Sequence, residues 1–231
     1  MAVFGVSVSI TIVAVGGGFS SPGPSFLNPP STSDMWAVGD NIRAGSILNY
    51  SLTKFVSHDS PWNSLGMHSS LVDSLVSLEF DHNDNNKWET TISITNGTIP
   101  MAISREDTIL LSNKQLTNAG PIAREFIPYY EPLESSILEV RDIALQPEYL
   151  TIGAEWNSIT GDVVTIPVKV TAQEKIRTNA GIFNTYVLSY TLNSKTSRIW
   201  IDHDIPLPIK AEVYDEQDKL QYRYTLVFYK R

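Results

Sequence analysis

Apolar and polar residues alternate through most of the chain after residue 164. Runs of roughly ten residues carry an apolar side chain at every second position, and short stretches rich in Asn, Gly, Ser or Asp separate them. In the last run this spacing aligns Leu220, Tyr222, Tyr224, Leu226 and Phe228 on one face. A period of two is typical of strands with one buried face, so we predict antiparallel strands joined by short turns over 164–229.

The first half of the chain carries the same pattern in shorter runs. Three segments alternate in this way: 45–55, 75–80 and 87–95. The last two are predicted to be the arms of a hairpin, because their connector, 81–86, consists of residues that tolerate turn conformations. Asn96-Gly97 is the strongest turn signal in the chain and predicts a following strand at 99–104 or 108–112.

One segment, 134–145, has the spacing of a helix. Its apolar residues recur every three or four positions: Ile137, Val140, Ile143 and Ala144. Pro132 near its start and Pro147 beyond its end are placed as helix boundaries prefer. We therefore predict one short amphipathic helix.

Together these elements predict a single, mainly β domain over residues 34–231. Long arms joined by short turns form an antiparallel meander, and the natural twist of strands curls such a sheet. The expected architecture is an open half-barrel with the short helical segment packed against it.

The N-terminus differs from the rest because residues 1–33 carry no charged side chain. The apolar run 2–15 has the length of a signal-peptide core, and residues 20–33 contain four prolines, as a linker does. We interpret 1–19 as a signal peptide or membrane anchor, which predicts an extracytoplasmic domain that is membrane-anchored or secreted. The run also alternates Val and Ile with Ser and Thr, so a first strand of the domain is the alternative.

The charge distribution argues against nucleic acid as a partner. The net charge is −8, and residues 34–165 hold 7 Lys/Arg against 18 Asp/Glu, whereas residues 166–231 hold 10 against 7. Phosphate binding relies on clustered Lys and Arg, which the acidic region lacks. The absence of cysteine excludes disulfides, thiolate metal sites and a cysteine nucleophile.

Three C-terminal segments resemble a known family: 181–190, 198–215 and 219–226. In them a strand with Trp and Asp precedes a proline-bearing bend and a strand ending in Tyr-Asp, followed after three residues by Lys-Leu. This pattern is similar to the C-terminal strands of the LolA-like periplasmic lipoprotein-carrier superfamily and related envelope proteins. The resemblance implies an unclosed antiparallel barrel with a helical plug, and in some members lipid or lipoprotein binding on the concave face.

Two polar clusters have partial metal-site character. Segment 81–86 copies the first ligands of a calcium loop, but Asn86 stands where glycine is required and Ile92 where the bidentate glutamate belongs. A hairpin connector is the favoured interpretation. Asp202-His203-Asp204 has no further ligand at a recognised spacing, so a polar strand end is favoured there.

No motif in the chain indicates an enzyme. It has no Gly-x-Ser-x-Gly elbow and no G-x-G-x-x-G fingerprint, and its carboxylate pairs cannot be told from solvated surface. We assign no catalytic, cofactor-binding or metal-binding residue and expect a non-enzymatic protein.

Aromatic residues are the remaining candidates for a functional surface. We expect them either to line an apolar concavity or to fill the strand core: Trp88, Trp156, Trp200, Tyr186, Tyr190, Tyr222 and Tyr224. An open concavity predicts binding of a lipid, lipoprotein or other hydrophobic ligand. A filled interior predicts a structural or protein-interaction module of the cell envelope. A hydrolase with an unrecognised site is the weakest hypothesis.

Overall fold

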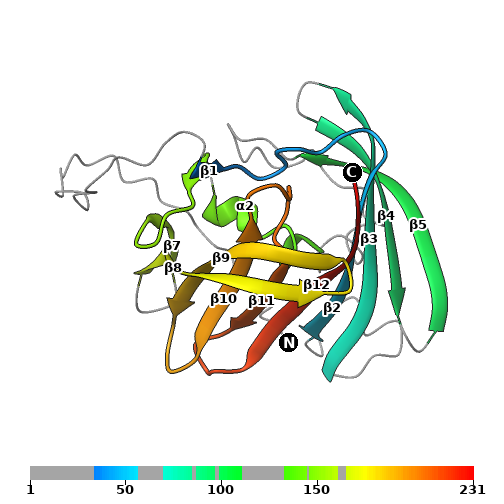
Figure 1. Ribbon diagram of the computed structural model, residues 1–231. Helices are drawn as coiled ribbons and strands as arrows, with labels where there is room; N and C mark the ends of the chain where they lie inside the picture. The colour runs from blue at the N-terminus through cyan, green and yellow to red at the C-terminus, as the bar shows by residue number, and fades with distance from the viewer. Residues whose placement is uncertain are drawn as a thin grey trace, which may run out of the picture.

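The computed structural model describes residues 34–56, 70–84, 87–96, 99–110, 133–144, 146–160 and 165–231. The predicted signal peptide or anchor and the linker lie outside these residues. Within them the chain forms a ten-stranded antiparallel sheet, a two-stranded sheet and a short helix, α2 (Figure 1). The prediction of a mainly β fold is confirmed.

The large sheet is a meander with one long-range junction. Its order is β5-β4-β3-β2-β12-β11-β10-β9-β8-β7, so strand β2 pairs with the last strand, β12. The strands are β2 (Ser46–Val56), β3 (Ser70–Asp84), β4 (Lys87–Asn96), β5 (Ile99–Leu110), β7 (Glu155–Thr160), β8 (Thr165–Thr178), β9 (Gly181–Thr191), β10 (Thr196–Asp202), β11 (Lys210–Tyr214) and β12 (Leu220–Lys230). The sheet is strongly curled and unclosed, as expected of a half-barrel (Figure 1).

The concave face of this sheet carries the core. Alternate side chains on each central strand are almost fully buried in one cluster: Leu48, Tyr50 and Leu52 on β2, Val76, Leu78 and Phe80 on β3, Ile199 and Ile201 on β10, and Tyr222, Tyr224 and Leu226 on β12. The period of two in the sequence therefore corresponds to real burial on one face.

The last strand departs from its predicted face at one position. A β-bulge lies between Leu226 and Phe228 in the pairing of β12 with β2. An extra residue in a strand turns the following side chains to the other face. Phe228 is consequently 46% exposed, Tyr229 packs against the core instead, and the prediction for Phe228 was wrong.

The predicted helix over 134–145 is much shorter in the structure. Helix α2 spans Val140–Ile143. Leu133 and Glu134 are also helical, but residues 135–139 between them and α2 form turns and a bend, and the Leu138 N–H donates to the Leu133 carbonyl at 3.1 Å. The Ser136 hydroxyl bonds the same carbonyl at 3.4 Å. Serines compete with helical bonding in this way. The apolar positions of the predicted helix are nevertheless all buried.

The hairpin arms are longer than the sequence predicted. Strand β3 runs to Asp84 and pairs with β4 up to Lys87, so most of the predicted connector 81–86 belongs to a strand. The two alternatives for the next strand merge into one, because β5 covers Ile99–Leu110. Backbone hydrogen bonding explains why β3 and β5 are longer than predicted, because longer paired strands leave fewer N–H and C=O groups without a partner.

Candidate functional site: the plugged concave face

Residues 133–144, called the plug below, cover the concave face of the sheet. Leu133, Ile137 and Leu138 have no exposed surface, and neither do Leu48 and Leu78 on the sheet. A side chain with no exposed surface has no neighbouring void large enough for water. Around these residues the protein's own side chains therefore fill the interior.

Polar contacts join the plug to three strands of the sheet, since Asn157 of β7 also donates to the Asp142 carbonyl at 3.1 Å. Glu139, next to α2, accepts a hydrogen bond from the Tyr222 hydroxyl of β12. Lys54 of β2 donates to the Ser135 carbonyl at 3.0 Å, and its Nζ lies 5.6 Å from the centroid of the Tyr222 ring. The plug is thus held by a carboxyl group and backbone carbonyls as well as by apolar contact.

Tyr222, which bonds Glu139, belongs to a cluster of three tyrosines in contact with one another. Tyr222 stacks on Tyr224 with ring centroids 5.9 Å apart, and Tyr224 meets Tyr50 edge to face at 5.5 Å. The Tyr50 hydroxyl is buried and has no hydrogen-bond partner in the structure. A buried hydroxyl without a partner is destabilising by about 1–3 kcal/mol, so the Tyr50 hydroxyl lowers the stability of this cluster.

Burial sets the protonation behaviour of this cluster. It raises the pKa of Glu139 to about 7, although the Tyr222 hydrogen bond and the Lys54 charge act in the opposite direction. Burial also raises the pKa of Tyr222 and of Tyr224 well above the usual value for tyrosine. Glu139 is therefore the member of this cluster whose charge changes near neutral pH.

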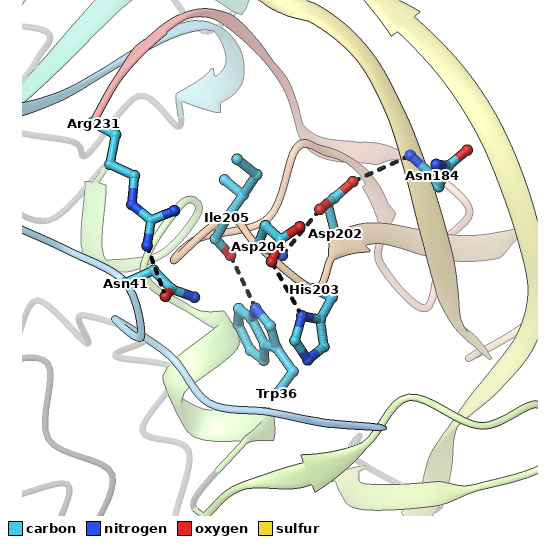
Figure 2. A network of polar contacts seen from close by, with 8 residues as sticks. All are labelled: Trp36, Asn41, Asn184, Asp202, His203, Asp204, Ile205 and Arg231. Carbon is cyan, nitrogen blue, oxygen red and sulfur yellow. Dashed lines mark hydrogen bonds and ion pairs between the residues drawn. The ribbon is translucent and has the colours of Figure 1, made fainter. Parts of the chain in front are cut away.

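A second element crosses the plugged side and was missed in the sequence. Strand β1 (Met35–Trp36) pairs with β6 (Glu148–Tyr149). Trp36 is buried, stacks on Trp156 at 5.9 Å, and donates from its indole Nε1 to the Ile205 carbonyl at 3.0 Å (Figure 2). The only sequence signal for this contact was a tryptophan directly after the linker.

The predicted polar strand end at 202–204 folds as a local turn. Asp202 accepts the Asp204 N–H at 3.0 Å and the Asn184 N–H at 3.1 Å (Figure 2). His203 Nδ1 lies 3.3 Å from an Asp204 carboxylate oxygen. Among the residues that the structure describes, no group of three or more His, Asp or Glu side chains is arranged to hold a metal. The strand-end interpretation fits this geometry, in which carboxylates bond to backbone N–H groups.

The aromatic candidates separate onto two faces of the sheet. Trp156, Tyr190, Tyr222, Tyr224 and Trp88 belong to the core cluster, and Tyr186 packs against it half-buried. They fill the interior together with the plug. The expectation that aromatic residues line an open concavity is not met for this set.

Trp200 lies on the opposite face. Its neighbours Ile199 and Ile201 point into the core, so Trp200 points away from it. There its Nε1 donates to a Glu174 carboxylate oxygen at 2.9 Å, and the Lys210 Nζ sits 4.5 Å from its ring centroid. The hypothesis that Trp200 lines the concave face was wrong.

Within the described part of the chain, no helix has the length and apolar character needed to span a membrane. The segment predicted as an anchor, 1–19, lies outside that part.

Comparison with known proteins gives weak structural matches. No family model matches the chain, and no curated protein matches its sequence. A Bacteroides fragilis protein of YmcC-like fold that is inferred to be exported is similar at 12% identity, with a TM-score of 0.38, over 85% of this chain and 99% of that one. The dehydratase domain from the CurK module of curacin polyketide synthase matches at 9% identity with a TM-score of 0.15, over 82% and 76% of the two chains. The resemblance to LolA-like carriers is not confirmed by these matches.

Proposed function

We propose that the chain is a non-enzymatic, extracytoplasmic β domain that acts as a protein-interaction or structural module of the cell envelope. The observation that carries this proposal is the plug on the concave face. Leu133, Ile137 and Leu138 have no exposed surface, so no space for an acyl chain remains beside them. The apolar run 2–15, within the uncharged segment 1–33, supports export.

Two carboxyl groups whose pKa burial raises, those of Glu139 and Asp202, support a non-enzymatic role. A catalytic acid or base needs a cleft in which a substrate can reach it. The Glu139 carboxyl instead bonds a tyrosine of its own sheet, and the Asp202 carboxyl bonds two backbone N–H groups. Both contacts are of the kind that hold segments of a fold together.

A carrier of hydrophobic ligands is the second candidate. It is favoured by two polar groups in the buried region of the plug and the sheet, namely the Glu139 carboxyl of the plug and the Tyr50 hydroxyl of β2, for which no hydrogen-bond partner is found among the described residues. A permanent core gains stability by replacing such groups with apolar ones. Their presence fits a plug that leaves the concave face at some stage.

Native mass spectrometry of the purified full chain separates the two candidates. We expect a single protein mass without an adduct, and recovery of tagged protein from the membrane or extracytoplasmic fraction. An adduct with the mass of a lipid would overturn the interaction-module proposal in favour of a carrier. Recovery in the cytosol with Met1 intact would overturn the extracytoplasmic location.

A further inference from the structure

The interface between plug and sheet brings titratable groups together from four elements. Among the described residues, the titratable groups that act on Glu139 are Tyr222 and Tyr224 on β12, Tyr190 on β9, Lys54 on β2 and Asp142 on α2. Tyr222 is separated from Glu139 by 83 positions in the chain, so their hydrogen bond is a tertiary tie between plug and sheet.

The polar ties between the plug and the sheet that the structure describes respond differently to pH. Asn157 of β7 donates to the Asp142 carbonyl at 3.1 Å, and this bond involves no carboxyl group. Lys54 bonds the carbonyl of Ser135, and a backbone carbonyl accepts equally well at any pH. The Glu139 carboxyl changes its charge, and its ionised form loses more hydration on burial than its neutral form does. The Glu139–Tyr222 tie is therefore the one that a change of pH alters.

The balance of neighbours around Glu139 favours its neutral form in the seated plug. Burial outweighs the opposing effects of the Tyr222 hydroxyl and Lys54, and the negative charge of Asp142 acts in the same direction as burial. A neutral carboxyl still accepts the Tyr222 hydrogen bond and gains a donor of its own. In a released plug, Glu139 faces water and ionises at its ordinary, lower pKa.

We propose that the plug is a pH-responsive element of the half-barrel, seated on the concave face while Glu139 is protonated and loosened when Glu139 ionises. The sign follows from linkage: the contribution of Glu139 to seating is fully present below its ordinary pKa and is lost as pH rises toward about 7. Release frees the sheet groups that the plug contacts, which include the Tyr222 hydroxyl and the Lys54 side chain. This inference goes beyond the proposed function, because it holds whether or not a ligand later binds there.

Hydrogen exchange of the full chain, read by mass spectrometry, tests the proposal. Peptides covering 133–144 are compared with peptides covering 196–214 at about pH 5 and about pH 8, after correction for intrinsic exchange rates. We expect the opening equilibrium of the plug to increase about ten- to a hundredfold at the higher pH. Peptides from β10 and β11 are expected to keep their protection, because their ties do not involve Glu139.

Variants assign the response to one carboxyl. In Glu139→Gln the plug should be protected equally at both pH values, since the amide cannot ionise. Glu148→Gln is the matched control, because burial also raises the pKa of Glu148 to about 7 but its strand, β6, lies outside the plug. This control should keep the wild-type response of the plug. A wild-type pH response that persists in Glu139→Gln, or no response in the wild type, overturns the proposal.

A measurement on the unmodified protein covers the case in which Glu139→Gln does not fold. Carbon-detected NMR of the glutamate side-chain carboxyl groups follows the titration of Glu139 directly. A midpoint near 7 supports the proposal, and a midpoint near the ordinary glutamate value of about 4.3 overturns it.

Discussion

Glu139 and Asp218 each tie together segments that are distant in the chain, one inside the half-barrel and the other at the tips of its hairpins. Asp218, in the turn between β11 and β12, accepts hydrogen bonds from the turn between β9 and β10. Its partners are the Lys195 N–H at 2.8 Å, the Ser194 N–H at 3.0 Å, the Asn193 amide at 3.1 Å and the Ser194 hydroxyl. Glu139 accepts a hydrogen bond from the Tyr222 hydroxyl, and its side chain is half-buried.

The same functional group therefore responds to pH in opposite directions. Donors that favour the charged form hold the pKa of Asp218 below its ordinary value, with the Ser194 hydroxyl contributing most. Burial raises the pKa of Glu139. The tie at the hairpin tips is present above the ordinary aspartate pKa and is lost in acid, whereas the tie of the plug weakens as pH rises toward neutral. Solvent exposure and the number of donors decide the sign.

The largest expected change in stability comes from a substitution that tests whether the side chains of the plug are buried in the core. Ile137→Ala removes a side chain with no exposed surface and should lower the free energy of unfolding by about 2–5 kcal/mol. Ile182→Ala is the matched control, because Ile182 on β9 is 52% exposed and its loss should change stability by less than about 0.5 kcal/mol. Urea unfolding monitored by circular dichroism measures both. Equal effects of the two substitutions would contradict burial of the plug.

The next effect isolates the titration of Glu139. As pH rises from about 4.5 to about 7, the wild type should lose roughly 2–3 kcal/mol of unfolding free energy through this residue, because its pKa is higher in the folded chain. Urea titrations across this range should show a shallower pH dependence in Glu139→Gln by that amount. If the wild type and the variant show the same dependence of unfolding free energy on pH, Glu139 does not cause it.

Two tyrosine substitutions compare a buried hydroxyl that has a hydrogen-bond partner with one that has none. Tyr222→Phe removes the hydroxyl that bonds Glu139 and should be destabilising by about 1 kcal/mol. Tyr50→Phe removes a buried hydroxyl without a partner and should be neutral or stabilising by up to about 1 kcal/mol. Thermal unfolding at about pH 6 distinguishes them. A larger loss in Tyr50→Phe than in Tyr222→Phe would reverse their assigned roles.

The smallest effect lies at the hairpin tips. Asp218→Asn should lower the melting temperature slightly near neutral pH, because an amide supports fewer of the four hydrogen bonds that Asp218 accepts. The difference from the wild type should disappear as pH falls through the lowered pKa of Asp218. Differential scanning fluorimetry at several pH values measures this. A difference that grows in acid would contradict the sign assigned here.

Local patterns predicted the strands well where one face is buried without interruption. The alternation of Leu48, Tyr50 and Leu52, and of Tyr222, Tyr224 and Leu226, corresponds to burial in one cluster. The helix was predicted at the correct place but too long, because spacing shows which residues are buried and does not show how the backbone around Ser136 closes its hydrogen bonds. Phe228 failed for a similar reason, since a bulge depends on the partner strand.

The candidate site was less accessible to sequence reasoning than the fold. The aromatic set was correctly associated with the sheet, but Trp200 lies on the far face because Ile199 and Ile201 take the core positions of β10. Glu139 was an unremarked acidic residue in the predicted helix. No local feature of the chain indicates that Tyr222 will meet it, because 83 residues separate them.

The pattern of side chains along the chain was enough to predict the class of the fold and the core faces of its central strands, because alternation is a local property that does not depend on which strands are neighbours. Only the tertiary structure decided that β2 joins β12, that residues 133–144 fill the concave face, and that Trp36 reaches the Ile205 carbonyl. These contacts depend on how a curled sheet brings distant segments together. The pKa of Glu139 belongs to the same category, since it reflects the loss of water that this packing imposes.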